Sequence, residues 1–412
     1  MTRFWLGGYG PGMDGAADGI GLLAGDEGRE ATTLAYRGAV VQAPSPSWLA
    51  RHPSLDVVYA ALEGDAAVQA FARTGESALA PLGAPVPVGD GVCHVAVAPN
   101  GSSLVASCYG DGRVVRFALD GEGRILPPRP DAAAALRAAL FGDDLDPDAP
   151  AVTPPGDGVA ALDPYAVGGD RTSHAHAAVF LPDGRIATTD LGFDLVRIWR
   201  ASTSSATQGG SATRGGSATQ GGSVTQGGSA TRGGSATQGG SATQGSAGLT
   251  LDHEVVLPLG TGPRHMVMHP SGHLHVVTEY SCEVFTLAAA ADGTWSVVAS
   301  TLSSPIAQVG TDFPAELARS RDGQFLYTAL RGSNTIAALR VRGGGESLES
   351  VALADSGVDW PRHHLVHEGK MLVAGQRSDT ITLLDLDERT GAPLGIRHEA
   401  QVPTPTHFLP VR

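Results

Sequence analysis

Arginine, histidine and glutamate stand close together in one stretch of the chain, GTGPRHMVMHPSGHLHVVTE at 260–279. Arg264 and His265 lie near its start, and Glu279 is its last residue. A guanidinium can stabilise negative charge that develops on a carbonyl oxygen, and an imidazole or carboxylate can take a proton from water. These residue types can therefore bind an oxygen that carries negative charge and move protons, provided that the fold brings them together.

The same stretch shows which elements must hold these residues. Apolar residues on either side of a Pro-Ser-Gly turn at 270–272 predict a hairpin with strands at 264–269 and 273–278. Further copies of this pattern begin at Trp48, His94, His176, Glu316 and His363. A unit of about 40 to 50 residues with three or four short strands is typical of a blade of a β-propeller.

The two ends of the chain complete one more blade. Residues 3–10, 19–24 and 30–40 resemble the second, third and fourth strands of a blade, and 405–411 resembles a lone first strand. Joining them closes the ring and removes open sheet edges. The sequence therefore predicts an all-β fold, a seven-bladed β-propeller with four-stranded antiparallel blades, formed as a single domain by residues 1–412.

Two segments interrupt the repeat. Residues 127–172 separate two blades and contain an Ala- and Leu-rich stretch at 129–145, which predicts a partly helical insert on the face that carries the site. Residues 203–248 repeat a SATQGG hexapeptide that has no apolar face, so we expect a disordered loop.

Antiparallel topology gathers titratable residues at one mouth of the channel. The starts of the first strands and the loops after the second strands lie on the same face of a propeller. These positions collect four arginines, five histidines, four carboxylates and two tyrosines. They are Tyr9, Glu63, His94, Tyr109, His176, Asp190, Arg264, His265, Glu279, Glu316, Arg331, Arg362, His363, Arg377 and His407. Such a composition is typical of a small-molecule site.

Some of these positions also allow a purely structural interpretation. His94 and His407 can bond the backbone between blades, Arg362 and Arg377 can balance acidic neighbours, and Asp190 can bond nearby backbone groups.

A metal site is a further alternative use of the histidines. His174 and His176 lie on one side of an extended strand, but no third ligand stands at a diagnostic spacing. We therefore expect no metal and no other cofactor.

The composition of the chain limits the classes of partner that it is expected to bind. A net charge of −14 disfavours nucleic acid and anionic membranes. The chain has no signal-like apolar core at its start and no apolar run of about 18 residues, so we expect a cytoplasmic protein that contacts no membrane.

We expect Cys93, Cys108 and Cys282 to be buried thiols, although Cys93 and Cys108 could also pair across a hairpin. Propellers of this size often work as monomers, so we expect a monomer.

Four phrases together resemble the seven-bladed propeller lactonase family of the 6-phosphogluconolactonase type. They are SHAHAAVFLPDGRIATTDLGFD, GPRHMVMHPSGHLHVVTE, AELARSRDGQFLYTALRGSNTI and WPRHHLV. The resemblance implies hydrolysis of an anionic sugar lactone, most directly 6-phosphogluconolactone, without a metal. A muconate-cyclising branch of this family implies four catalytic residues, which fall on His176, Arg264, Glu279 and Arg331.

These residues suggest a division of roles. Arg264 and Arg331 would bind phosphate or polarise the lactone carbonyl, His176 or Glu279 would activate water, and His265 would assist proton transfer. The residues expected to bind substrate are His94, Tyr109, His265, Arg362, His363 and Arg377. Two other functions stay open, namely a muconate-type lactone cycloisomerase and a propeller that only binds a partner.

Overall fold

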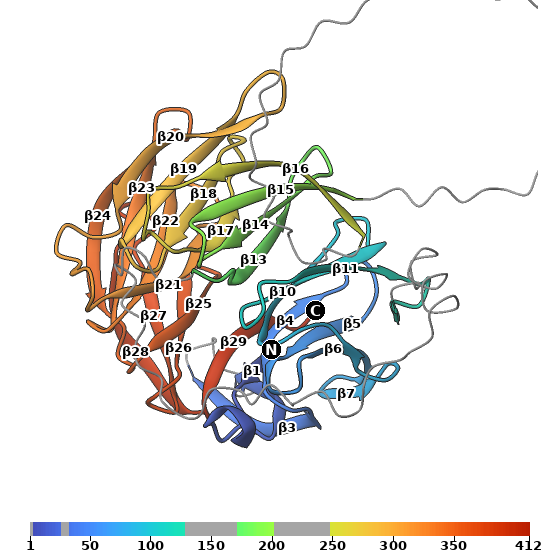
Figure 1. The fold of residues 1–412 in the computed structure, drawn as a ribbon. Helices are drawn as coiled ribbons and strands as arrows, with labels where there is room; N and C mark the ends of the chain where they lie inside the picture. Colours follow the sequence, from blue (N-terminus) through green and yellow to red (C-terminus); the bar gives the residue numbers. More distant parts are fainter. Residues whose placement is uncertain (1–2, 26–32, 128–170, 202–247) are drawn as a thin grey trace, which may run out of the picture.

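Seven antiparallel sheets surround a central axis in the computed structural model, which describes residues 3–25, 33–127, 171–201 and 248–412 (Figure 1). The only helical elements among these residues are two 3-10 turns, η1 (Pro11–Met13) and η2 (Glu63–Asp65). Consecutive inner strands contact one another around the whole ring, and the last contacts the first. The predicted all-β, seven-bladed propeller is confirmed.

The strands of each blade run from the channel outward. The blade shared by the chain ends comprises β29 (Pro405–Pro410), β1 (Arg3–Gly8), β2 (Gly19–Gly25) and β3 (Leu34–Gln42). The second blade comprises β4 (Pro46–Arg51), β5 (Val57–Leu62), β6 (Ala67–Gly75) and β7 (Ala78–Pro81). The third blade comprises β9 (Val92–Val97), β10 (Ser103–Cys108), β11 (Val114–Leu119) and β12 (Ile125–Leu126). The fourth blade comprises β13 (Ala175–Phe180), β14 (Ile186–Asp190), β15 (Leu195–Ala201) and β16 (Leu249–Val256). The fifth blade comprises β17 (Pro263–Met268), β18 (Leu274–Thr278), β19 (Glu283–Ala289) and β20 (Trp295–Leu302). The sixth blade comprises β21 (Phe313–Arg319), β22 (Phe325–Arg331), β23 (Thr335–Arg342) and β24 (Ser347–Asp355). The seventh blade comprises β25 (Pro361–His367), β26 (Lys370–Gly375), β27 (Thr380–Leu386) and β28 (Pro393–Gln401). A short strand, β8 (Val86–Pro87), adds to β6, so this one blade has five strands where four were predicted.

The pairing of β29 with β1 closes the ring. Trp5 lies opposite Leu409 and Leu6 lies opposite Phe408 in an antiparallel register. Phe408 and Phe4 are each only 1 % exposed and pack with Leu372 of the preceding blade. The closure therefore buries aromatic side chains between blades as well as satisfying the backbone edges, as the two ends of the sequence predicted.

A β-bulge opens every one of the seven inner strands. In each blade the register between the first and second strands shifts where the inner strand begins, so that the inner strand has one residue more than its partner. The residues at this first bulge position are Ser47, Cys93, His176, Arg264, Ala315, Arg362 and Thr406. A bulge re-aims the side chains beside it, so this feature decides what the mouth contains.

Side chains tie neighbouring bulges together. The Thr189 hydroxyl donates to the Arg264 carbonyl at 2.7 Å and accepts from the backbone N–H of Ala177 at 3.0 Å. The Thr406 hydroxyl donates to the Ser47 carbonyl at 2.9 Å in the same way. These bonds fix the first residues of adjacent inner strands relative to each other.

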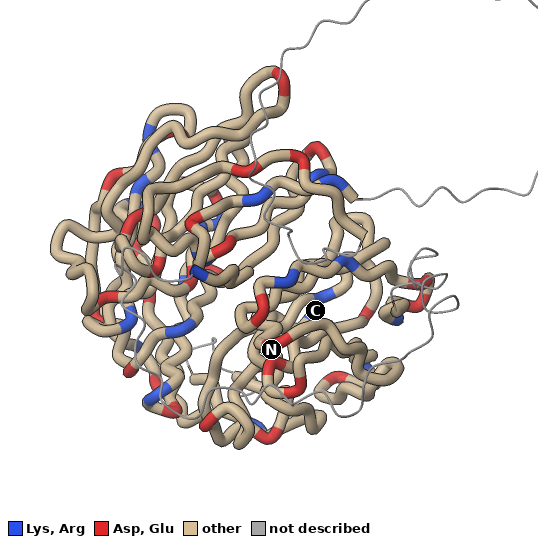
Figure 2. The backbone as a smooth tube through the Cα atoms, viewed as in Figure 1, with Lys and Arg blue, Asp and Glu red and all other residues tan. Residues whose placement is uncertain are grey.

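Other sequence expectations have mixed outcomes. The three cysteines are buried and none forms a disulfide, as expected. The predicted helix at 129–145 lies outside the described residues, as do the core of the 127–172 insert and nearly all of the 203–248 tract. No helix among the described residues is long and apolar enough to cross a membrane. Figure 2 shows acidic and basic residues interspersed around the described part of the ring.

Truncation of Phe408 to alanine tests the closure. We expect Phe408→Ala to lower the free energy of unfolding by about 3–5 kcal/mol, because it empties a buried space between two blades. The measurement is urea denaturation followed by tryptophan fluorescence. Leu394→Ala is the control, since Leu394 is 47 % exposed on an outer strand. Equal urea midpoints for the two variants would contradict the prediction that packing at the closure contributes this much to the free energy of unfolding.

Candidate active site

Two buried arginines share one carboxylate at the mouth of the channel. Arg264 Nε lies 2.9 Å and Arg331 Nη2 lies 2.8 Å from the same oxygen, Oε2 of Glu279. The bulge of β17 places Arg264, the end of β22 places Arg331, and the loop after β18 places Glu279. Arg331 Nε also donates to the Phe313 carbonyl at 2.9 Å, which anchors this guanidinium to the backbone.

Several N–H groups of the arginine pair are not satisfied by well-aligned hydrogen bonds within the described part of the chain. Arg264 Nε, Arg264 Nη1 and Arg331 Nη2 are buried and form no aligned hydrogen bond with any of the described residues. Their contacts with Glu279 are therefore close ion pairs with poorly directed N–H groups. Because a buried N–H without an acceptor is unfavourable, these groups suit an anionic or carbonyl oxygen of a ligand.

Both members of the ion pair stay charged at neutral pH. Burial, together with the neighbouring Arg331, lowers the pKa of Arg264 to about 10. Burial would raise the pKa of Glu279, but Arg331 and Arg264 outweigh this effect and lower it below the ordinary value. The site therefore holds two cations against one firmly ionised carboxylate, which leaves positive charge for a developing oxyanion.

Trp48 and four histidines fill the channel below the arginine pair. The centroid of the Trp48 ring lies 4.5 Å from that of His94, 5.0 Å from His265, 5.4 Å from His363 and 4.1 Å from His407. The ring of His176, from the neighbouring bulge, lies 5.0 Å from that of His265. These rings form one largely buried layer, which we call the floor, and we use the name well for this floor together with the arginines and aromatic rings at the mouth.

The floor histidines are neutral near pH 7. Burial lowers the pKa of His94, His176, His265, His363 and His407 well below the ordinary value, and neighbouring cations or imidazoles lower it further. Neutral imidazoles can accept a proton, so this layer is able to supply a base.

One floor histidine has a carboxylate partner. His265 Nδ1 lies 2.6 Å from Oε2 of Glu316, which extends from the bulge of the next inner strand, β21. His363 Nε2 lies 3.8 Å from the same oxygen, too far for a hydrogen bond. Burial raises the pKa of Glu316 above its ordinary value.

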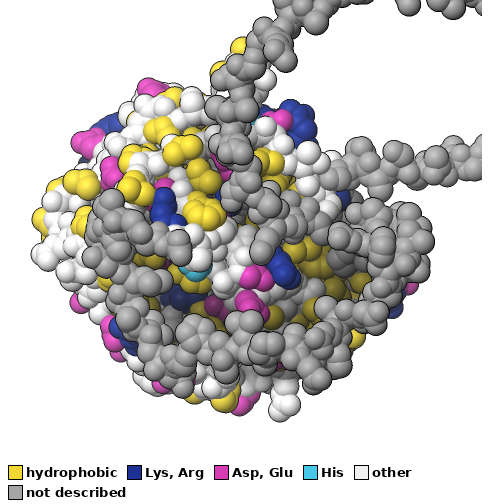
Figure 3. All heavy atoms as spheres, in the orientation of Figure 1, with side chains coloured by type: hydrophobic (Ala, Val, Ile, Leu, Met, Phe, Trp, Pro, Cys, Tyr) yellow, Lys and Arg dark blue, Asp and Glu magenta, His cyan; other side chains and the backbone are white. Residues whose placement is uncertain are grey.

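Arginines and aromatic rings form the rim of the well. The Arg362 guanidinium lies over the Tyr9 ring at 4.9 Å, and the Tyr9 hydroxyl donates to Glu63 at 3.1 Å. The Arg377 guanidinium stacks on the Trp360 ring at 3.5 Å. Figure 3 shows charged side chains and a histidine exposed around the middle of this face.

Tyr109 and His174 lie at the edge of the well. Their rings stack at 4.5 Å, and His174 Nδ1 lies 2.6 Å from the Tyr109 carbonyl. His174 therefore faces Tyr109, and no group of three His, Cys, Asp or Glu side chains among the described residues is placed to share a metal ion. Asp190 accepts from the backbone N–H groups of His174 and Phe193, each at 3.0 Å, so it holds the loops at this edge.

The structure gathers the residues singled out from the sequence in one well, while their roles stay predictions. The described contacts directly link Arg264, Glu279 and Arg331, and they place His176 beside His265. Sequence reasoning placed Glu316 at the mouth without giving it a role, and it did not select Trp48 or Trp360 as site residues. Trp48 and Glu316 occupy the same repeat position as His265, and that alignment was the available signal. Trp360 lies two residues before the first aligned position, Arg362, so only the structure reveals it.

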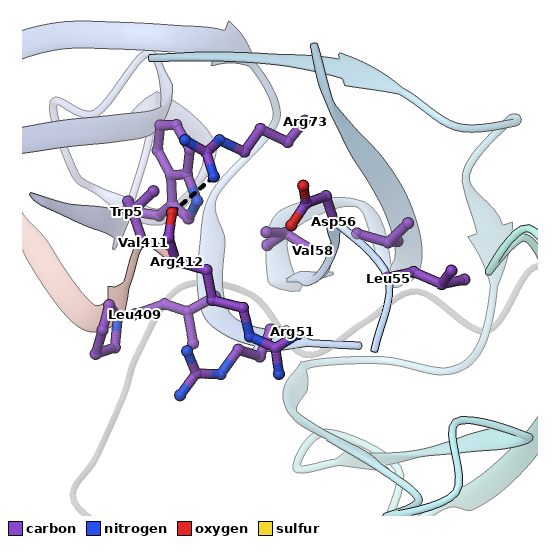
Figure 4. A pocket seen from close by; sticks show the side chains of 11 residues that line it. Trp5, Arg51, Leu55, Asp56, Val58, Arg73, Leu409, Val411 and Arg412 are labelled. Carbon is purple, nitrogen blue, oxygen red and sulfur yellow. Dashed lines mark hydrogen bonds between the residues drawn. The ribbon is translucent and has the colours of Figure 1, made fainter. Parts of the chain in front are cut away.

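A hollow lies on the opposite face, where the turn between β4 and β5 meets the end of β29. Arg51, Arg73 and Arg412 line it with Trp5 and Asp56, and Arg73 Nη1 donates to the Arg412 carbonyl at 2.7 Å (Figure 4). It contains no histidine and no buried carboxylate. It therefore lacks the acid–base groups that the mouth provides.

Comparisons with known proteins agree on one family. The family described as "Lactonase, 7-bladed beta-propeller" matches residues 3–223 and 241–410. The uncharacterized protein YwcC of Lactococcus lactis is 23 % identical over 244 residues, which are 58 % of this chain and 59 % of that protein. A 6-phosphogluconolactonase of Yersinia pestis is 27 % identical over 141 residues, 34 % of this chain and 42 % of that protein. The chain thus covers less than two thirds of the curated relatives that it matches.

A solved structure supports the fold over the full length. The periplasmic gluconolactonase PpgL of Pseudomonas aeruginosa superposes with a TM-score of 0.72 at 17 % identity, and the match covers 100 % of this chain and 99 % of that one. At this level of identity the likeness shows the fold alone.

The buried neutral histidines predict how stability depends on pH. Their pKa values are lowered in the folded state, so below about pH 6.5 the unfolded chain binds more protons than the folded one. We therefore expect full stability above that pH and a loss as the pH falls. The histidines with lowered pKa are His94, His176, His265, His275, His363, His364 and His407.

Urea midpoints measured at pH 8.0, 6.5 and 5.0 check this expectation. The raised pKa of Glu316 makes stability fall as the pH rises, which is the opposite trend, but it is one group against seven histidines with a lowered pKa. His275→Gln should reduce the slope below pH 6.5, since burial lowers the pKa of His275 to about 3. A midpoint that does not change between pH 8.0 and 5.0 would show that these imidazoles are not held neutral.

Proposed function

Because this chain belongs to the seven-bladed β-propeller lactonase family, we propose that it hydrolyses a sugar lactone at the mouth of its central channel. The observation that carries the proposal is the pair of buried arginines, Arg264 and Arg331, whose N–H groups surround Glu279 without being saturated by it. Membership of this family supports lactone hydrolysis, and the residues of the well supply the groups that the reaction needs.

The two arginines would stabilise the charge that forms on the lactone oxygen. Attack of water on the carbonyl carbon moves an electron pair onto that oxygen, and two guanidiniums in a largely dry well interact with it strongly. The arginines thus provide, without a metal, the positive charge that the transition state requires. His176 and Glu279 remain the bases suggested by the sequence, with His265 as an assistant in proton transfer.

We propose 6-phosphogluconolactone as the substrate. Relatives and structural neighbours are named as a 6-phosphogluconolactonase and a gluconolactonase, which supports a gluconate-type lactone. Arg362 supports an anionic group, because it forms no ion pair with any described carboxylate; its guanidinium lies over the Tyr9 ring and makes a long contact of 3.4 Å with Gln376 Oε1. A monomer without nucleic-acid or membrane partners and a cytoplasmic location stay predictions, since the similar Pseudomonas protein is named as periplasmic.

Substitution of the arginines tests the reaction. We expect the wild type to open freshly prepared 6-phosphogluconolactone faster than the spontaneous rate, with no loss after treatment with EDTA. Arg264→Ala and Arg331→Ala should each lower kcat by roughly 100- to 1,000-fold, because each removes a donor to the oxyanion. Arg342→Ala is the matched control, since Arg342 pairs with Glu349 on an exposed outer strand.

The product distinguishes hydrolysis from its main alternative. Hydrolysis in ¹⁸O-labelled water places one label in the carboxylate, whereas a cycloisomerase incorporates none. A wild-type rate equal to the spontaneous rate with this lactone, with unphosphorylated gluconolactone and with a muconate would refute the proposal and favour a binding scaffold.

Arg362 tests the charge of the substrate. We expect Arg362→Gln to raise KM for the phosphorylated lactone by roughly 10-fold or more, because charge-assisted hydrogen bonds contribute about 1.5–3 kcal/mol. The same variant should change KM for unphosphorylated gluconolactone much less, and this comparison is its internal control. Equal effects on both lactones would show that Arg362 does not recognise the phosphate.

A further inference from the structure

The pairing of His265 with Glu316 distinguishes it from the other floor histidines. His265 Nδ1 lies 2.6 Å from Glu316 Oε2, whereas the Nδ1 atoms of His94, His176 and His407 are buried without a hydrogen-bond partner among the described residues. The geometry places the His265 proton on Nδ1 and leaves Nε2 as the atom with the free lone pair. A carboxylate also stabilises the imidazolium that forms when Nε2 takes up a proton.

The other two candidate bases are less suited to this task. Glu279 Oε2 already contacts two guanidiniums, so this oxygen is engaged by cations and is not free to accept a proton from water. His176 has no carboxylate to compensate its charge, because no described acceptor reaches its Nδ1. Among the three, only His265 has a partner that compensates a positive charge.

The bulge of β17 brings the dyad next to the arginine pair. Arg264 and His265 are adjacent in the bulge of β17, and the His265 ring packs at 5.0 Å from the rings of both Trp48 and His176. The Glu316 side chain is 11 % exposed, so the dyad is not sealed from the well. A lactone whose carbonyl oxygen meets the arginines would have its carbonyl carbon above the histidine layer.

We propose that His265 is the general base of the lactonase and that Glu316 is its positioning residue. This inference rests on the proposed function. The water oxygen bonds to the carbonyl carbon while one water proton moves to His265 Nε2, and the carbonyl oxygen becomes an oxyanion facing Arg264 and Arg331. When the carbonyl re-forms, the ring C–O bond breaks and the proton on Nε2 passes to the ring oxygen. The products are a free hydroxyl and a carboxylic acid, which ionises in solvent.

Many groups face the dyad, and all of them affect its titration. From the inner strands of the ring these are Arg264, His94, His176, Arg362, His363, His364 and His407, with Arg331 from β22. The cations and burial keep His265 neutral at rest, and Glu316 is the one carboxylate at hydrogen-bond distance from it among the described residues. Removal of this charge should therefore weaken the base.

Glu316→Gln tests the dyad through the pH profile of kcat/KM. The amide keeps the size of the side chain but loses the negative charge, so the pKa of His265 should fall. We expect the acid limb of the profile to move to lower pH and the plateau to fall at least 10-fold, since general-base catalysis contributes roughly 10²–10⁴-fold. Glu316→Asp keeps the negative charge. Its plateau of kcat/KM and the pH of its acid limb should therefore lie between those of Glu316→Gln and the wild type. Glu349→Gln is the control, because Glu349 is an exposed carboxylate on an outer strand.

Nitrogen-15 NMR of the histidines gives a readout that is independent of turnover. The wild type should show His265 as the Nδ1–H tautomer, identified by the loss of its signals in His265→Gln, and Glu316→Gln should change that tautomer or its titration. Thermal unfolding monitored by circular dichroism checks that each variant folds, and Glu316→Asp serves if Glu316→Gln does not.

The possible failures can be told apart. An unchanged limb and plateau in Glu316→Gln, with hydrolysis by the wild type intact, would overturn the dyad but leave the lactonase proposal standing. The absence of any lactone hydrolysis by the wild type would overturn both the proposed function and the proton role. An Nε2–H tautomer of His265 in the wild type would overturn the dyad whatever the kinetics show.

Discussion

The extra residue at the start of each inner strand is the constraint on which the mouth depends. Successive side chains of a regular strand point to opposite sides, so Arg264 and His265 could not both face the well. The bulge of β17 lets Arg264 reach Glu279 while His265 reaches Glu316. Repeated in seven blades, the same irregularity lines one channel mouth with a polar upper layer and an aromatic lower one.

The ring protects an arrangement that is costly to bury. A desolvated guanidinium is unfavourable unless it is paired, and Arg264 is only 2 % exposed. One carboxylate, Glu279, compensates two such cations, so the site retains positive charge in a place with little water. Closure by β29 and β1 keeps the blades in register, and the Thr189 and Thr406 bonds hold neighbouring bulges together. The fold thereby supplies a preorganised environment in which an oxyanion is favoured.

Family membership and chemistry contribute different parts of the functional conclusion. The family supports lactone hydrolysis, but propellers host many unrelated activities, so the assignment has to rest on the residues of the well. Those residues include an electrophilic arginine pair, a carboxylate–imidazole pair and a rim arginine with no ion-pair partner among the described carboxylates. Each part has a distinct place in the opening of an anionic lactone.

The sequence by itself determined the fold and the residue types of the site. The repeated hairpin pattern predicted seven blades and their closure, because strand periodicity and turn residues are local properties of the chain. Alignment of the repeats predicted which side chains meet at one mouth, including Arg264, Glu279 and Arg331. The alignment could not predict which residues of different blades contact one another.

Only the tertiary structure decided the pairings within the well. It joined Arg264 and Arg331 through Glu279, paired His265 with Glu316 and placed Trp48 among the histidines. These contacts join residues from different blades, and they depend on the bulges and on the packing of neighbouring inner strands. Repeat position tells which face a residue shares, but the distance between two side chains across a channel depends on how the whole ring closes.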